Sequence, residues 1–250
     1  MDYEKLTTTQ WKSQLGRLER VLDRIRDRPI PVAPGRIVPD PDELAIGTGR
    51  QLKAAIMFTD ISGFSARPSG ASDEQQFLLN VLNLYFSEMI RVCEEYGGTV
   101  EKNTGDGLMA YFEDNTGDPP ETGCKRAIAA ALTMFYVTQN AINPVLLRSN
   151  TQPIEFRVGI DYGPVTIAQL GAARRFGGLV AIGATANIAS KMLEEAGPGD
   201  LFIGEDVHKQ LPVRWMQYSN LAKFTTGWCY VPSRLDYSFY KYVGRWKGPL

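Results

Sequence analysis

Residues 53–64, Lys53-Ala-Ala-Ile-Met-Phe-Thr-Asp-Ile-Ser-Gly-Phe64, decide the fold. The stretch begins as an apolar run of strand length and ends in a polar, glycine-containing turn, which is typical of a buried strand. The carboxylate of Asp60 stands where the apolar run ends. We therefore predict a buried strand over 53–59 with an acidic side chain at its carboxyl end.

The elements that follow predict an α+β fold. Ser72 or Asp73 is expected to cap a helix that Gly97-Gly98 ends. Short strands at 99–102 and 108–112 flank the turn Asn103-Thr-Gly-Asp-Gly107, which predicts a hairpin. A helix over about 122–141 and a strand over 154–160 complete the order strand, helix, strand, strand, helix, strand. That order is the ferredoxin-like βαββαβ core.

An added hairpin arm is expected after this core. Strands at 165–170 and 179–182 flank the glycine-rich segment 171–178, and a helix is predicted over 184–195. The last fifty residues, rich in Tyr and Trp, are expected to finish the sheet and add a tail. Their aromatic side chains are interpreted as core or interface packing.

The first fifty residues form a separate segment in this interpretation. Residues 8–28 place apolar side chains three or four positions apart, which predicts an amphipathic helix that packs on the core or on a partner chain. Residues 29–49, with five prolines and three glycines, predict an extended connector. We therefore divide the chain into 1–50, helix and connector, and 51–250, catalytic domain with a C-terminal tail.

Composition limits the classes of function. The chain has 250 residues, 44% of them apolar, which suffices for one core, and its net charge of -1 argues against nucleic acid or an anionic membrane as a partner. Its three cysteines are expected to be free thiols. We find no apolar run of about 18 to 20 residues and no signal-peptide pattern, so we expect a soluble, cytoplasmic protein without a membrane partner.

Two carboxylates suggest a metal site. Asp60 ends a buried strand and Asp106 lies in the tight turn of a neighbouring hairpin, so both can converge at one edge of a sheet. Convergent carboxylates suit Mg²⁺ or Mn²⁺, which are held by one or two carboxylates together with substrate phosphates. The alternative for each residue is local: Asp60 caps the next segment and Asp106 serves its turn.

Four motifs in order resemble those of class III adenylate and guanylate cyclases. They are Phe58-Thr-Asp-Ile-Ser-Gly-Phe64, Lys102-Asn-Thr-Gly-Asp-Gly107, Val158-Gly-Ile-Asp-Tyr-Gly163 and Asn187-Ile-Ala-Ser-Lys191, so the resemblance covers roughly 53–205. It implies class III cyclase architecture with active sites at a homodimer interface. It also implies cyclisation of a nucleoside triphosphate to a 3′,5′-cyclic nucleotide and pyrophosphate. Two divalent metal ions, Mn²⁺ or Mg²⁺, would be held by Asp60, Asp106 and the backbone carbonyl of Ile61.

The resemblance implies further catalytic residues. Asn187 matches a residue that orients the ribose and would act in trans, and Lys191 stands where the family usually has an arginine. Lysine supplies charge without the planar fork, so slower chemistry or altered geometry is expected. Arg174 and Arg175 are near the family's phosphate-binding arginine, and counting back from Asn187 favours Arg175; the alternative is a solvated loop. No protein side chain is assigned as the base, because the sole histidine, His208, lies outside the motifs.

The base-reading positions favour a pyrimidine substrate. Lys102 matches the lysine of adenylate cyclases, but Val180 stands where they have an aspartate. A buried amino group facing Val180 would go unpaired at a cost of about 1 to 3 kcal/mol, which uracil avoids because its O4 is an acceptor. UTP is therefore the first choice, CTP the second and ATP the third. Thr185 could replace the missing acceptor, and Phe64 is also expected to contact the substrate.

A soluble cyclase with this altered pair resembles the pyrimidine cyclases of the bacterial Pycsar anti-phage systems. The resemblance implies synthesis of cyclic UMP or cyclic CMP on infection and a separate cyclic-nucleotide-binding effector that reads the product. Two alternatives stay open, an adenylate cyclase that makes cyclic AMP and an inactive nucleotide-binding dimerisation module. A diguanylate-cyclase-like enzyme is disfavoured because the turn reads Asn-Thr-Gly-Asp-Gly rather than Gly-Gly-Asp-Glu-Phe.

Overall fold

The computed structural model describes residues 5–27, 49–103, 105–114, 122–170, 178–222, 228–229 and 234–248. The predicted connector, apart from its last residue, lies outside these described residues. So do Arg174 and Arg175, in the turn of the predicted arm.

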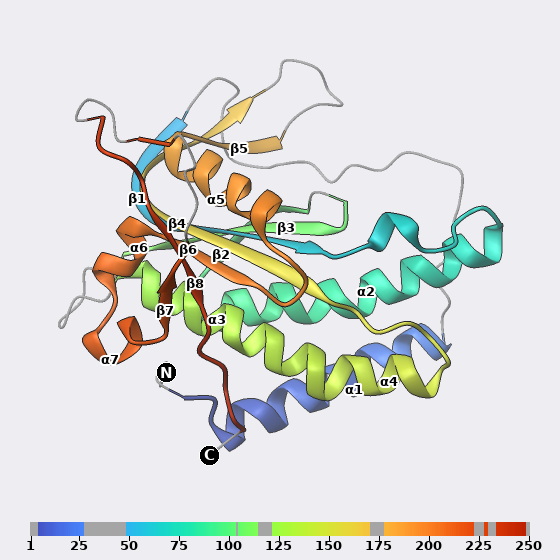
Figure 1. Ribbon diagram of the computed structural model, residues 1–250. Coiled ribbons are helices and arrows are strands. Elements are labelled where there is room, and N and C mark those ends of the chain that lie inside the picture. The colour runs from blue at the N-terminus through green and yellow to red at the C-terminus, as the bar shows by residue number, and fades with distance from the viewer. Residues whose placement is uncertain are drawn as a thin grey trace.

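The predicted ferredoxin-like core is confirmed. Its strands run in the order β2-β3-β1-β4, and β1 pairs antiparallel with both β3 and β4 (Figure 1). Two helices connect the strands in the predicted sequence of elements. The elements are β1 (Gly49–Ile61), α2 (Ser72–Glu95), β2 (Thr99–Asn103), β3 (Gly107–Glu113), α3 (Gly123–Val137) and β4 (Phe156–Leu170).

Each face of the sheet carries its own apolar core. Helices α2 and α3 cover one face, and α5 (Ala184–Glu195) covers the other (Figure 1). Ala55 and Met57 of β1 pack with the α2 and α3 cluster, whereas Ala54 and Ile56 pack with α5. All four are fully buried. Because β1 is buried on both faces, its sequence is a continuous apolar run and does not alternate with polar residues.

The helix predicted over 122–141 is longer in the structure. After α3, a π-helical segment at Thr138–Ile142 leads into α4 (Asn143–Arg148). The side chain of Asn143 donates to the carbonyl of Ile154 at 2.9 Å and accepts from its N–H at 2.8 Å. This pair of bonds fixes the end of the helical layer against the start of β4.

The strands predicted separately at 154–160 and 165–170 are one strand, β4, and this part of the prediction was wrong. Pro164 does not interrupt it, although proline lacks the N–H that a sheet normally uses. Pairing with β6 ends at Ile160 and pairing with β5 starts at Thr166, so among the described strands Pro164 has a neighbour, β1, on one side only. The missing donor can therefore face the unpaired side.

The arm and the C-terminal residues extend the sheet, as predicted. β5 (Gly178–Ile182) pairs antiparallel with the end of β4, which confirms the arm as a hairpin. β6 (Leu201–Gly204) joins β4 in parallel, and the described strands continue in the order β6-β8-β7. The remaining elements are α6 (Glu205–Gln210), α7 (Val213–Met216), β7 (Ser219–Leu221) and β8 (Phe239–Tyr242).

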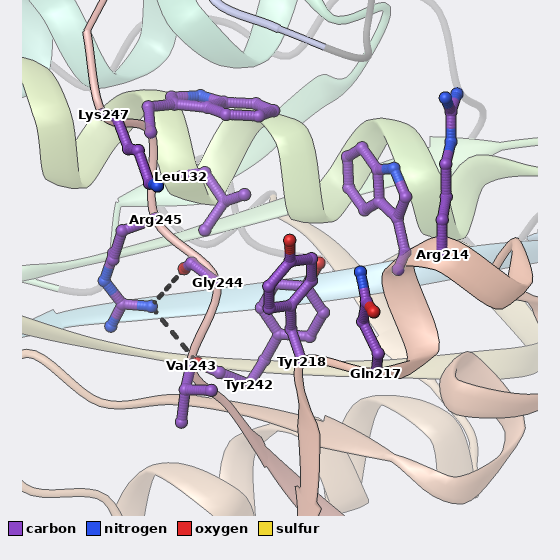
Figure 2. A pocket seen from close by; sticks show the side chains of 11 residues that line it. Leu132, Arg214, Gln217, Tyr218, Tyr242, Val243, Gly244, Arg245 and Lys247 are labelled. Carbon is purple, nitrogen blue, oxygen red and sulfur yellow. Dashed lines mark hydrogen bonds between the residues drawn. The ribbon is translucent and has the colours of Figure 1, made fainter.

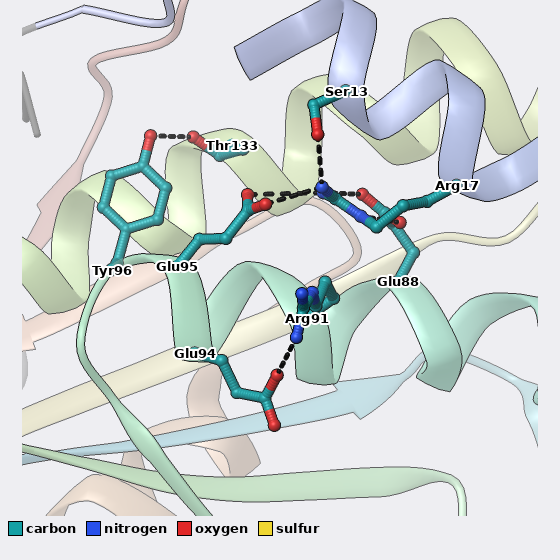
Figure 3. A network of polar contacts seen from close by, with 8 residues as sticks. All are labelled: Ser13, Arg17, Glu88, Arg91, Glu94, Glu95, Tyr96 and Thr133. Atoms are coloured by element: carbon teal, nitrogen blue, oxygen red, sulfur yellow. Dashed lines mark hydrogen bonds and ion pairs between the residues drawn. The ribbon is translucent and has the colours of Figure 1, made fainter.

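The N-terminal helix α1 (Thr8–Asp27) packs on the core of its own chain. Leu18 and Val21 are buried in the cluster that α2 and α3 share. The Arg17 guanidinium reaches two carboxylates of α2, Glu88 at 3.0 Å and Glu95 at 2.5 Å (Figure 3). Core packing, one of the two predicted uses of this helix, is therefore what the structure shows.

Two predictions from composition concern the state of the three cysteines and the character of the helices. Cys93, Cys124 and Cys229 are free thiols, the first two buried and the third exposed. Burial raises the pKa of the Cys93 and Cys124 thiols. In the described ranges, none of the helices combines the length and the apolar character that crossing a bilayer requires.

Candidate active site

Asp60 and Asp106 lie at the same end of two paired strands. Asp60 is directly opposite Gly107, and the N–H of Ile61 donates to the carbonyl oxygen of Asp106 at 3.2 Å. The chain reverses between β2 and β3 through Gly105, whose φ of +87° favours glycine. The hairpin thus places the second aspartate beside the end of β1.

Arg157 of β4 holds the Asp60 carboxylate from the other side. The two residues are paired in the β1–β4 register, and Nε and Nη2 of Arg157 donate to Oδ2 of Asp60 at 3.0 and 2.8 Å. Nη1 donates to the carbonyl of Ala196 at 3.1 Å, which fixes the guanidinium. Since both bonds to Asp60 use Oδ2, Arg157 orients the carboxylate without occupying Oδ1.

A cavity of about 470 Å³ lies between the end of β1 and α5. Asp60 and Arg157 line it from the sheet, and Asn187, Ser190 and Glu194 line it from the helix. These three helical residues follow at spacings of three and four, so they share one face of α5. The cavity therefore joins a carboxylate and a guanidinium on the sheet to a polar stripe on the helix. Its apolar lining includes Phe58, Met109 and Leu193.

Gly159 sets the distance between α5 and the sheet. A Cβ at this position would lie 2.3 Å from the carbonyl oxygen of Ala189 in α5, closer than non-bonded atoms approach. A side chain other than hydrogen would push the helix away from β4. The glycine of the third motif thus fixes the depth of the cavity that α5 covers.

Several predicted site residues lie outside the lining of this cavity. Phe64, in the short helix Phe64–Ala66, packs against the α2 and α3 cluster. The side chain of Ile61 is buried, so only the backbone of Ile61 can face a ligand. Lys191 is exposed, with Nζ 6.0 Å from the centre of the Trp228 ring. Asp106 is half-buried beside the cavity rather than among its lining residues.

The residues predicted to read the base are placed by their strands. Lys102 of β2 is opposite Met109, and Val180 of β5 is opposite Ala168. The side chains of Lys102 and Val180 are outside the described part of the structure, as is all of Arg175. Thr185 is buried in the first turn of α5, where its hydroxyl donates to the carbonyl of Pro164 at 3.0 Å.

Polar lining residues that the sequence-based prediction assigned no role include Arg157, Ser190 and Glu194. Arg157 directly precedes the motif that starts at Val158, and a strand register that placed it opposite Asp60 would have identified it. Ser190 and Glu194 continue the helical face of Asn187, so a helical projection would have found them. The spacing of Ser190 and Glu194 is enough to place them on the helical face of Asn187. Identifying Arg157 also requires knowing that β4 pairs with β1.

The acidic residue of β4, Asp161, is buried instead of facing the cavity. It is 2% exposed and accepts a short hydrogen bond from the hydroxyl of Tyr237. Burial raises its pKa to about 8, and the Tyr237 bond partly opposes that effect. Asp161 therefore belongs to the packing between β4 and the C-terminal segment.

Comparison with known proteins identifies relatives at low identity. A cytidylate cyclase of Staphylococcus aureus is 26% identical over 160 residues, 63% of this chain and 37% of the relative. An adenylate cyclase of Anabaena cylindrica is 27% identical over 158 residues, 60% of this chain and 29% of the relative. A uridylate cyclase of Burkholderia cepacia is 26% identical over 188 residues, 73% of this chain and 77% of the relative. The chain thus spans about a third of the length of the first two relatives.

Solved structures share the fold. The guanylyl cyclase Cya2 superposes with a TM-score of 0.64 at 23% identity, covering 80% of this chain and 96% of that one. The adenylyl cyclase CyaB from P. aeruginosa gives a TM-score of 0.60 at 24% identity, with coverage of 80% and 98%. The family model of the adenylate and guanylate cyclase catalytic domain matches residues 48–228, the part of the chain that contains the sheet end and the α5 cavity. The chain belongs to this family of nucleotide cyclase catalytic domains.

Proposed function

We propose that this chain is a metal-dependent nucleotide cyclase that converts UTP to cyclic UMP and pyrophosphate, with CTP as the second choice and ATP the third. One observation carries the proposal: Asp60 and Asp106 lie at the same end of paired strands, Arg157 binds Asp60, and Asn187 lines one cavity with Asp60 and Arg157. In the reaction, the ribose 3′-oxygen attacks the α-phosphorus and the bond to the pyrophosphate oxygen breaks. The hydroxyl proton passes to water or to a phosphate oxygen.

The donor set fits two divalent cations, Mn²⁺ or Mg²⁺. Asp60 and Asp106 supply carboxylates from adjacent strands, and Arg157 uses Oδ2 of Asp60 but not Oδ1. Such ions take one or two carboxylates plus phosphate oxygens, so no larger protein cage is required. The carboxylates and the Ile61 carbonyl would hold the ions. Bound metal would supply Lewis acidity that activates the 3′-hydroxyl and neutralises the triphosphate charge.

Arg157 is proposed to bind the triphosphate. Its guanidinium lines the cavity beside Asp60, and a planar guanidinium can donate two parallel hydrogen bonds to phosphate oxygens. The bond from Nη1 to Ala196 holds the group in place before substrate arrives. Arg157 would therefore add to the charge neutralisation proposed for Lys191 and Arg175.

Two copies of the chain are proposed to form two equivalent sites by isologous pairing, with Asn187 orienting the ribose in the site of the facing copy. Within one chain, Asn187 and Asp60 line the same cavity, so action in cis is the competing arrangement. Mixing Asp60→Asn with Asn187→Ala protein distinguishes the two. Shared sites would restore about a quarter of wild-type activity, since half the dimers are mixed and each has one intact site. Sites built in cis would restore none.

The preference for UTP rests on Lys102 and Val180. Val180 offers no acceptor to an amino group, whereas uracil O4 can accept from Lys102. Thr185, the residue that could replace the acceptor, is buried and directs its hydroxyl at Pro164, which supports the same choice. The relative named as a uridylate cyclase matches over most of its own length. We further propose that the cyclic nucleotide is an anti-phage signal read by a separate effector.

Purified protein incubated with each of the four nucleoside triphosphates and Mn²⁺ tests the proposal when the products are separated. Cyclic UMP should be the main product, and Asp60→Asn and Asp106→Asn should abolish it. Asp73→Asn, which neutralises an exposed carboxylate in the first turn of α2, is the matched control and should keep full activity. Absence of any cyclic product would refute the cyclase and favour a binding module, and cyclic AMP alone would refute the pyrimidine preference.

The substitution Val180→Asp tests whether residue 180 determines which nucleobase the enzyme accepts. A restored acceptor should raise the ratio of ATP to UTP turnover by about 5- to 150-fold, the equivalent of roughly 1 to 3 kcal/mol. Val180→Leu, which changes size without adding an acceptor, should leave the ratio near the wild-type value. An equal effect of both variants would show that position 180 does not read the base.

A further inference from the structure

A second cavity has a volume of about 530 Å³. It is formed by α3, by α7 and the turn after it, and by the end of β8 with the residues that follow (Figure 2). Its inner wall is Leu132, Trp215 and Tyr242, all buried in the cluster on the α2 and α3 face of the sheet. The α5 cavity lies on the opposite face, so the two are separate sites. The volume of the second cavity is in the range of small-molecule binding sites.

Aromatic rings make up much of this second cavity. Trp215 and Trp246 meet edge to face with ring centres 6.1 Å apart, and Tyr218 and Tyr242 do the same at 6.2 Å. Figure 2 shows the hydroxyls of both tyrosines and the amide of Gln217 pointing to the same side of the cavity. A planar ring can therefore find both aromatic faces and hydrogen-bonding groups here.

Hydrogen bonds fix these walls before any ligand is present. The indole N–H of Trp246 donates to Thr133 Oγ1 at 3.0 Å. The Arg245 guanidinium donates to the carbonyls of Tyr242 at 3.2 Å, Gly244 at 2.7 Å and Gly199 at 2.6 Å. These bonds tie the segment after β8 to α3 and to the loop before β6. A preformed site loses less entropy on binding than one that must be ordered.

The charge around the second cavity is positive. Arg214, Arg245 and Lys247 line it, and the described residues of its lining include no carboxylate. The Arg245 guanidinium lies 4.5 Å over the centre of the Phe135 ring, donates to the Gly199 carbonyl and interacts with the Asp200 carboxylate. Arg245 is therefore engaged within the protein, and Lys247 is the cation on which contact with an anion depends. Cations gathered over aromatic walls attract anions, and they exclude cationic ligands by repulsion.

We propose that the second cavity binds a small planar aromatic anion, with the chemistry of a nucleoside monophosphate. The ring would lie against the Trp and Tyr side chains, and the phosphate would face Lys247. Neither half of such a ligand is sufficient: the free phosphate lacks the aromatic contact and the nucleoside lacks the charge. The site is independent of the proposed catalytic reaction, because none of its lining residues belongs to the α5 cavity.

Titration of the full chain with AMP, without metal, tests this site by calorimetry and tryptophan fluorescence. Two of the four tryptophans line the cavity, so saturable quenching is expected. Adenosine and inorganic phosphate should each bind at least about tenfold more weakly than AMP, a loss of roughly 1.4 kcal/mol. Equal binding of phosphate alone would reduce the site to an anion site and overturn the proposal.

Variants locate the binding. Lys247→Glu should weaken AMP at least tenfold, and Tyr218→Ala, which truncates a side chain that is 44% exposed, should weaken it without unfolding the protein. Arg148→Glu, a charge reversal of an exposed cation at the end of α4, is the control and should bind like the wild type. AMP binding that survives Lys247→Glu but disappears in Arg157→Ala would place the ligand in the α5 cavity. That result, or no saturable binding at all, would overturn the proposal.

Discussion

Asp161→Asn should change how the stability of the fold depends on pH. Asp161 is 2% exposed and accepts from Tyr237, and asparagine can accept the same bond without carrying a charge. Burial raises the Asp161 pKa from 3.8 to about 8, so folding favours the protonated acid. The stability that this group contributes is complete below its unfolded pKa and is lost as the pH rises towards 8.

The size of the effect follows from proton linkage. Between the two pKa values the unfolded chain has released the proton and the folded chain retains it, so stability falls by about 1.4 kcal/mol for each pH unit. From about pH 5 to about pH 7 the wild type should lose roughly 3 kcal/mol through this one group. The asparagine variant lacks this dependence, while every other titrating group is common to both proteins.

Urea unfolding of both proteins at a series of pH values between about 5 and 8 measures the difference. The gap in unfolding free energy should grow in favour of Asp161→Asn as the pH rises. Tyr237→Phe removes the hydrogen bond that opposes the pKa increase, so it should extend the pH dependence to higher pH. Parallel pH profiles for the wild type and Asp161→Asn would refute the assignment of a buried, protonated acid.

Two further substitutions test the packing, and urea unfolding measures both. Gly159→Ala should destabilise the protein by about 1 to 3 kcal/mol, because the new Cβ would meet the Ala189 carbonyl at 2.3 Å. Its control is Gly16→Ala in α1, where the new Cβ has ordinary contacts, so this variant should be neutral or stabilising. Arg17→Met should cost about 3 to 5 kcal/mol by leaving the buried carboxyl of Glu88 without its partner. Burial already raises the Glu88 pKa to about 7, so this loss should be larger at pH 8 than at pH 5; equal losses at the two pH values would contradict the expectation.

The sequence predicted the elements best where the pattern is local. The strand at 53–59, the hairpin around Asp106 and the helix at 184–195 are all present, the last with the predicted bounds. Each depends on residues a few positions apart, whose spacing already determines which face is apolar. The break expected between 160 and 165 was wrong because Pro164 is tolerated only through the pairing of its neighbours, which the sequence does not contain.

The features of the candidate site also divide into those that local sequence predicts and those that only the tertiary structure reveals. The sequence by itself indicated the family and the ends of the elements that carry Asp60 and Asp106, because these depend on residue identity and short spacing. The metal-binding role of the two aspartates stays a prediction. Only the tertiary structure placed Arg157 against an aspartate 97 positions away and joined α3 to the C-terminal segment around a second cavity. Such contacts depend on strand register and helix packing over the whole chain, and no short stretch of sequence specifies them.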